Sequence, residues 1–215
     1  YSSSSDNPTV TANSRTVTWA VTDANSAGAC TSVGVTSTIS INAVNDAPTT
    51  GNKTLSATED TAYIFSSDNF SFSDVEGDNI SKVKITTLES TGTLYVDADN
   101  DDSYDSGEDV TLNQEVAISN IANLQFIAAS NANGTSYATF GFKVSDGIAW
   151  SESAGTNTIN VAAVNDAPAT GNKTLSAAED TVYTFSSSDF LFSDVDGDSI
   201  SKIKITTLES AGTLY

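Results

Sequence analysis

The chain has 215 residues with 28 acidic and eight basic side chains, and its formal net charge is −20. This balance argues against nucleic acid or anionic membrane as a partner, because binding to either requires a basic patch. The absence of histidine excludes catalysis by a histidine base, Ser-His catalytic triads and histidine-ligated zinc.

The sequence also lacks methionine and has a single cysteine, Cys30. The lack of methionine predicts that the chain is an internal piece of a longer protein. A lone cysteine cannot form an internal disulfide, so we expect stability to come from packing and from bound metal. No apolar run approaches the roughly 18–20 residues of a membrane span. No signal peptide is recognisable, which is compatible with secretion of a longer parent protein.

Residues typical of strands and turns dominate the composition, and Thr, Val and Ile alternate with polar residues. The predicted strands, in chain order, cover residues 53–57, 62–66, 81–88, 92–96, 110–116, 124–128, 137–145 and 156–162. About seven or eight short strands separated by turns indicate an all-β antiparallel sandwich. The expected core consists of Phe65, Phe70, Phe72, Leu88, Leu94, Leu124, Phe126, Phe140 and Phe142. Within 137–145 we also expect Ala138 and Val144 to point inward.

An internal repeat organises these elements. Residues 44–95 and 164–215 align without gaps at a spacing of 120, and 41 of the 52 positions are identical. Thr16–Asp23 (TVTWAVTD) similarly matches Thr139–Asp146 (TFGFKVSD), and a VNDAP string follows each. The predicted units are residues 1–45, the C-terminal half of a preceding repeat; 46–165, a complete repeat; and 166–215, the N-terminal half of the next repeat.

Each half-repeat alone would expose sheet edges and half of a core. We therefore expect residues 1–45 and 166–215 to be completed either by the rest of a longer polymer or by the head of a neighbouring copy. In both cases the head-to-tail direction repeats and gives an open filament.

The VNDAP linkers at Val44–Pro48 and Val164–Pro168 are the most specific short strings in the chain. Together with Glu59-Asp60, FSDVEGD at Phe72–Asp78 and VSDG at Val144–Gly147, they resemble the tandem repeats of bacterial cadherin-like proteins. The likeness covers essentially the whole chain. It implies Greek-key sandwiches, calcium as the bound ion, and a role as calcium-stiffened extenders in very long surface adhesins or matrix proteins.

The strongest candidate metal site is the loop 97–108, DADNDDSYDSGE. Its spacing is that of an EF-hand calcium loop, with carboxylates at positions 1, 3, 5, 9 and 12 and a backbone carbonyl at position 7. These ligands are Asp97, Asp99, Asp101, Asp105 and Glu108, with Ser103 at position 7. Asp102 replaces the usual glycine at position 6, and Asp tolerates the left-handed conformation needed there. We expect strands on both sides of the loop; the alternative is a solvated acidic hairpin tip.

Two further constellations are acidic. One is the turn formed by Asp74, Glu76 and Asp78, which is repeated at Asp194, Asp196 and Asp198. Its alternate carboxylates should point in the same direction and so could share a cation. The alternative is an ordinary polar turn between strands. The other is the repeat boundary, where the resemblance implies a bridging calcium and the alternative is a plain linker. Its candidate ligands are Asn45, Asp46, Glu59 and Asp60, copied at Asn165, Asp166, Glu179 and Asp180. We expect Asp23 to approach Asn45 and Asp46, and Asp146 to approach Asn165 and Asp166.

The sequence therefore predicts a non-enzymatic structural extender, extracellular or on the cell surface, in which calcium neutralises repelling carboxylates and stiffens linkers. Its expected partners are neighbouring repeats or further copies joined head to tail. The alternative is an adhesive module that binds a glycan or surface ligand directly and gains avidity by repetition. An enzyme would need a cleft that holds two carboxylates without a metal between them.

Overall fold

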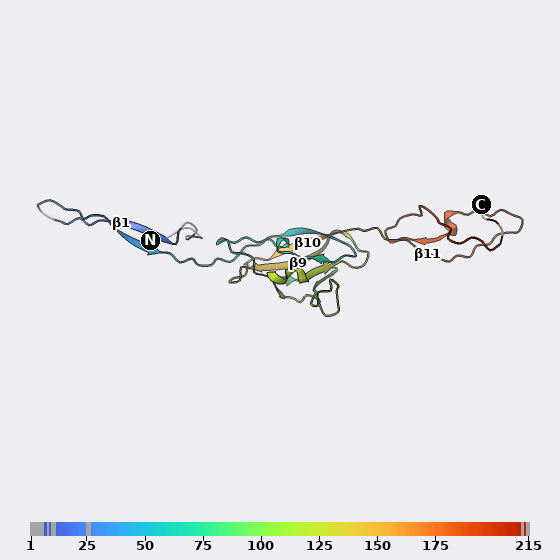
Figure 1. Ribbon diagram of the computed structural model, residues 1–215, viewed down its shortest axis with the longest axis horizontal. Helices are drawn as coiled ribbons and strands as arrows, with labels where there is room; N and C mark the ends of the chain where they lie inside the picture. The colour runs from blue at the N-terminus through green and yellow to red at the C-terminus, as the bar shows by residue number, and fades with distance from the viewer. Residues whose placement is uncertain (1–6, 8, 10–11, 25–26, 212, 214–215) are drawn as a thin grey trace. The chain divides into compact units, whose positions relative to one another are not determined.

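The structure, a computed structural model, describes residues 7, 9, 12–24, 27–211 and 213 (Figure 1). It is mostly β, with 34% strand and 6% helix, and contains several antiparallel sheets, so the all-β prediction is confirmed. The chain separates into two compact units, Tyr1–Ala162 and Ala163–Tyr215. None of the helices among the described residues has the length and apolarity needed to cross a membrane.

The elements are short. The strands are β1 (Ser14–Trp19), β2 (Val35–Ser40), β3 (Lys53–Thr58), β4 (Tyr63–Ile64), β5 (Lys82–Thr87), β6 (Thr93–Val96), β7 (Glu115–Ala117), β8 (Leu124–Ile127), β9 (Gly134–Ser145), β10 (Gly155–Ala162), β11 (Ala169–Gly171) and β12 (Leu191–Ser193). The 3-10 helices are η1 (Ser67–Asn69), η2 (Ile118–Asn123) and η3 (Ser187–Asp189).

The first unit begins with an antiparallel hairpin. Strand β1 pairs with β2 from Ser14 opposite Ser40 to Trp19 opposite Val35. An isolated bridge between Thr22 and Thr31 extends the hairpin toward its closed end.

A sandwich-like arrangement of two sheets follows in the same unit (Figure 1). The larger sheet has the strand order β3-β10-β9-β5-β7, and the smaller one has the order β4-β8-β6. Every pair in these two sheets is antiparallel except β3 and β10, which are parallel. The prediction of antiparallel pairing therefore holds for every pair in the two sheets except this one. Strands β4 to β9 lie between β3 and β10 in the chain, so no tight turn forces β3 and β10 to run in opposite directions.

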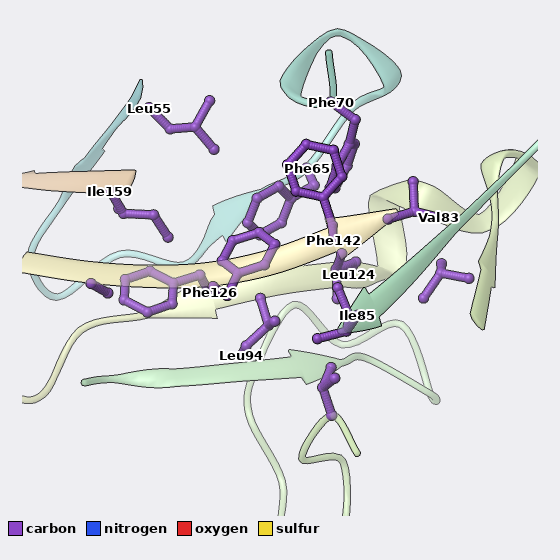
Figure 2. Close-up of a cluster of buried hydrophobic side chains, with 14 of the residues drawn as sticks. Leu55, Phe65, Phe70, Val83, Ile85, Leu94, Leu124, Phe126, Phe142 and Ile159 are labelled. Carbon is purple, nitrogen blue, oxygen red and sulfur yellow. The ribbon is translucent and has the colours of Figure 1, made fainter. Parts of the chain in front are cut away.

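The core between the sheets is aromatic at its centre (Figure 2). The rings of Phe65 and Phe140 pack edge to face with centroids 5.6 Å apart, and those of Phe70 and Phe142 do so at 5.1 Å. Along β9 the inward positions Ala138, Phe140, Phe142 and Val144 are all buried, as the alternation predicts.

Most of the predicted core is confirmed, because Phe65, Phe70, Leu94, Leu124, Phe126, Phe140 and Phe142 are buried and Phe72 is partly buried. The prediction that Leu88 belongs to the core is wrong, since 41% of this residue is exposed. The register shifts between Ile85 and Thr87, and β5 ends at Thr87, so Leu88 lies beyond the strand.

The predicted strand 110–116 is also shortened. The amide of Gln114 donates to the carbonyl of Thr111, and the Gln114 side chain accepts from the Thr111 amide. With Asn113 at φ 65°, these bonds form a turn, and β7 begins only at Glu115.

The second unit contains one described sheet, formed by β11 and β12. The residues that repeat β3 and β5, 173–178 and 202–207, form no strand there. Their side chains are largely exposed.

Candidate metal centres

The acidic loop, Asp97–Glu108, begins directly after β6 and returns to it. The Val96 amide donates to the Glu108 carbonyl at 2.9 Å, and Tyr95 forms a bridge with Asp109. The loop thus has a strand on one side and a bridge residue on the other, close to the predicted strand–loop–strand form. Its Tyr104 ring packs edge to face on Tyr95 at 5.4 Å.

Asp97, at the first loop position, is held from three directions. Its Oδ1 accepts from the Asn100 amide at 2.7 Å, and its Oδ2 accepts from the Asp102 amide at 3.1 Å and from Gln125 Nε2 at 3.2 Å. The Tyr95 hydroxyl in turn donates to Gln125 Oε1 at 2.9 Å. Because Asp97, Gln125 and Tyr95 are all buried, these bonds fix the loop's first carboxylate on the sheet.

Sequence reasoning missed Gln125. Its position in the sequence could have revealed it. Gln125 lies between Leu124 and Phe126, which face inward, and the alternation of a strand places the Gln125 side chain on the opposite face of the sheet.

The backbone of the loop has the predicted turn. Asp102, in place of the usual glycine, has φ 60°, and Asn100 has φ 62°. Glu108 reaches back across the loop, since its Oε1 accepts from the Ala98 amide at 2.7 Å and its Oε2 accepts from the Asp105 amide at 2.9 Å. The last carboxylate therefore closes the loop onto its beginning.

The predicted carboxylates gather in two groups that share Asp99. One consists of Asp97, Asp99 and Glu108, and the other of Asp99, Asp101 and Asp105; within each group, ligand oxygens lie within 4.8 Å of one another. Oxygens of one calcium ion, each at 2.3–2.6 Å from it, fall in this range. Both groups can in principle hold a metal ion, and a set made only of carboxylates suits a hard cation such as calcium.

The carboxylates of the acidic loop repel one another most strongly around Asp99. The charge of Asp101 does most to raise the pKa of Asp99, followed by burial and by the charges of Glu108, Asp105 and Asp97. Burial and the charge of Asp97 similarly raise the pKa of the Tyr95 hydroxyl. A bound cation would relieve this repulsion.

Ser103, predicted to offer its carbonyl, is exposed, and its amide donates to Asp101 Oδ1 at 2.8 Å.

A second acidic group, here called the linker cluster, consists of Asn45, Asp46, Asp74, Glu76, Asp78 and Asp146. It joins three segments that are distant in the sequence. Asn45 Nδ2 donates to Asp146 Oδ2 at 2.9 Å, and the Asp46 amide donates to Glu76 Oε2 at 3.2 Å. Asp74 Oδ1 accepts from the amides of Glu76 and Asp78 at 2.9 and 3.1 Å, which shapes the predicted turn.

Two carboxylate oxygens of the linker cluster are buried without a partner. Asp74 Oδ2 and Glu76 Oε1 are closed off from solvent, and neither has a hydrogen-bond partner among the described residues. A buried carboxylate oxygen without a partner is costly. A cation beside these two oxygens would remove that cost.

Asp146 also belongs to this cluster. Burial opposes its ionisation, but donation from the Ala149 amide, the Asn45 side chain and the Ile148 amide outweighs burial and holds the pKa of Asp146 below its usual range. Asp146 is therefore a charged ligand candidate at neutral pH.

The position of Asp146 corrects the prediction that it approaches Asn165 and Asp166. Asp146 lies in the turn after β9, beside Asn45. Strand β10 then carries the chain along the sheet, from Gly155 to its far end at Ala162. Asp146 thus meets the linker that precedes its own unit.

The copy of the linker cluster in the second unit repeats the bonds that Asp46 and Asp74 make in the first. The Asp166 amide donates to Asp196 Oδ2 at 2.8 Å, and Asp194 Oδ1 accepts from the amides of Asp196 and Asp198 at 3.0 and 3.1 Å. Asn165 Nδ2 donates to the Asp166 carbonyl, just as Asn45 does to that of Asp46.

Glu59 and Asp60 lie apart from Asn45 and Asp46. Both follow the end of β3, and the Glu59 amide donates to the carbonyl of Ala162 at 3.0 Å. Glu59 is buried and accepts from Asn133 Nδ2 at 3.0 Å, whereas Asp60 accepts weakly from the Asn131 amide. A strand of six residues spans about 20 Å, so β3 separates this pair from the linker cluster. Their copies Glu179 and Asp180 are exposed.

Asp23 is likewise not brought to Asn45. It lies near the closed end of the β1–β2 hairpin, where its Oδ1 accepts from the Cys30 amide at 2.7 Å. The open end, where the Ile41 amide donates to the Asn13 carbonyl, is the end that leads to Asn45.

Comparisons with protein-family models, with curated proteins and with solved structures found no significant match for the chain.

Proposed function

We propose that the chain is a structural extender segment of a large extracellular adhesin or matrix filament. In this proposal it consists of Greek-key, cadherin-like sandwich repeats of about 120 residues, the spacing of the sequence repeat. Calcium ions at the acidic loop and at the linkers rigidify it. The role is mechanical rather than enzymatic.

The linker cluster is the observation that carries the proposal. A linker residue, Asp46, donates its amide to Glu76, while Asn45 reaches Asp146, so the linker already contacts two loops of the sandwich that follows it. The buried oxygens of Asp74 and Glu76, for which the described part of the chain offers no partner, would supply ligand positions at that junction. A cation there would tie the linker to the sandwich through strong carboxylate bonds.

The acidic loop supports the same proposal from within the sandwich. Its five candidate carboxylates are already gathered, and one buried hydrogen bond from Gln125 anchors the first of them. A loop whose ligands are placed before the ion arrives loses less entropy on binding. Calcium would therefore stiffen both the loop and the linker, as an extender under load requires.

Small-angle X-ray scattering of the whole chain tests the proposal. With calcium, we expect a longer maximum dimension and a narrower range of shapes than in chelator, and magnesium, which prefers to keep its waters, should not substitute. Identical profiles in calcium and in chelator would contradict calcium stiffening.

A further inference from the structure

The acidic loop covers part of the outer face of the small sheet. Tyr95 of β6 and Gln125 of β8 face each other across the two strands. Because their strand neighbours belong to the core, alternation directs both side chains to the opposite face. They are nevertheless only 0% and 1% exposed, since Tyr104 of the loop packs on the Tyr95 ring and Asp97 accepts from Gln125. Two polar side chains are thus buried beneath the loop, outside the core.

The hydrogen bonds of Asp97 leave one of its two oxygens free for an ion. An ionised carboxylate has about four lone-pair sites on its two oxygens. Oδ2 of Asp97 accepts from the Asp102 amide at 3.1 Å and from Gln125 Nε2 at 3.2 Å, so both of its sites are taken. Among the described residues, Oδ1 accepts only from the Asn100 amide, at 2.7 Å. Asp97 can therefore offer an ion one oxygen, Oδ1.

The Tyr95 hydroxyl fixes the orientation of the Gln125 amide. It donates to Gln125 Oε1 at 2.9 Å, which turns Nε2 toward Asp97. The reversed amide would place Oε1, an acceptor, against a buried carboxylate and would leave that carboxylate without its donor. The three buried side chains therefore have one arrangement in which both of these contacts are hydrogen bonds.

We propose that Gln125 is a positioning residue for calcium in the acidic loop and that Tyr95 orients it. Gln125 acts through Asp97: it keeps Oδ2 occupied, so that Oδ1 is the oxygen left for an ion that Asp99 and Glu108 also bind. Because Asp97 is ordered before the ion arrives, less entropy is lost on binding. This inference rests on the proposed function and adds a buried pair on β6 and β8 to the residues that set the calcium affinity of the loop.

Two variants of the whole chain separate positioning from a merely structural role. Gln125→Leu removes both hydrogen bonds and leaves the buried Tyr95 hydroxyl without its acceptor, so it should lower the melting temperature in chelator and also the calcium affinity. The double variant Tyr95→Phe/Gln125→Leu replaces both partners by apolar groups, which should restore most of the lost stability. It should not restore the calcium affinity, because Asp97 still lacks the bond from Gln125.

Gln114→Leu is the matched control. The Gln114 side chain closes a turn by accepting from the Thr111 amide at 2.8 Å, and Gln114 is not one of the candidate ligands. Its replacement should lower the melting temperature and leave the calcium affinity of the loop at the value of the parent. A loss of stability is thereby distinguished from a loss of positioning.

Terbium, a hard cation that takes oxygen ligands as calcium does, reports on the acidic loop separately from the linker cluster. Its emission is sensitised by energy transfer from a nearby tyrosine, and Tyr104 belongs to the loop, whereas the linker cluster contains no tyrosine. Displacement of terbium by calcium gives the calcium affinity of the loop. In Gln125→Leu and in the double variant we expect this affinity to be roughly tenfold to a hundredfold below that of the parent, as when other groups that orient a metal ligand are removed.

The outcomes distinguish the positioning role from the calcium site itself. Parent-like calcium affinity in the double variant would overturn the positioning role and leave the loop site intact, whether or not Gln125→Leu folds by itself. Parent-like affinity in a folded Gln125→Leu variant would do the same. A parent chain without sensitised emission, or with emission that calcium does not reduce, would contradict calcium binding by the loop and with it the positioning role.

Discussion

At the scale of single residues, Asp97 and Asp74 show two ways of holding a carboxylate. Asp97 is buried, and both of its oxygens accept hydrogen bonds. Asp74 has one oxygen that accepts two amides and one that is buried without a partner among the residues described. Asp97 is thus satisfied before any ion binds, whereas Asp74 gains a partner only from one.

Replacing Asp74 by Asn should have opposite effects with and without calcium. The Asn oxygen can still accept the amides of Glu76 and Asp78, so the turn survives. In chelator the variant should be slightly more stable than the parent, because the charge on a buried oxygen is gone. The variant should bind calcium at least about tenfold more weakly than the parent, which corresponds to a loss of ~1.4 kcal/mol in binding free energy.

Calorimetric titration and thermal melts measure the two effects of Asp74→Asn. Asp68→Asn makes the same charge change at an exposed position of η1 and should change neither quantity. Equal calcium affinity in the parent and in Asp74→Asn would contradict the proposal that the linker cluster binds calcium.

Replacing Glu108 by Ala should abolish binding of one calcium. Glu108 closes the acidic loop through the amides of Ala98 and Asp105 and is the candidate bidentate ligand. Isothermal titration should show one site fewer than in the parent. Asp109→Ala is the control, because Asp109 accepts from the Tyr104 hydroxyl outside the ligand groups. An unchanged stoichiometry in Glu108→Ala would contradict the loop site.

At the scale of elements, β6 depends on a tight turn at Gly92, which has φ 73°. A Cβ there would lie 2.6 Å from Phe126 Cζ and 2.8 Å from the Ile127 carbonyl oxygen. Gly92→Ala should therefore destabilise the sandwich by about 2–4 kcal/mol, since strain at positive φ adds to overpacking.

Gly77→Ala separates the two contributions to the Gly92 effect. Gly77 has φ 82°, but a Cβ would meet nothing within 4 Å, so only the conformational cost of about 1 kcal/mol should remain. Urea unfolding in chelator measures both variants. Equal losses would show that packing at Gly92 contributes nothing.

The sequence predicts some elements better than others, for physical reasons. The alternation along β9 is long and aromatic, so its inward face is predicted residue by residue. The start of β7 depends instead on a turn closed by the Gln114 side chain, a local bond that composition does not reveal.

The acidic loop could be predicted because its ligands are close in the sequence, and spacing alone brings them together. The linker cluster was only partly predictable, because it joins residues as distant as Asn45 and Asp146. Which end of the sandwich receives Asp146 or Glu59 depends on strand direction. That in turn depends on how β3 and β10 pair, and their parallel pairing is not encoded in any short segment.

At the scale of the whole molecule, the charge of −20 makes self-repulsion oppose the compact state, and the single cysteine provides no internal disulfide. The acidic loop gathers carboxylates that repel one another, and the linker cluster has two buried carboxylate oxygens without a partner among the described residues. We therefore expect the free energy of unfolding of this protein to rise with calcium concentration.

The melting temperature of the whole chain during a calcium titration tests this claim most directly. For each site that only the folded state forms, calcium at a hundredfold excess over its Kd should add about 2.7 kcal/mol. In a unit of this size that corresponds to a rise of roughly 5–15 °C above the value in chelator, with little change in magnesium. The same melting temperature in calcium, in magnesium and in chelator would contradict a link between calcium and stability.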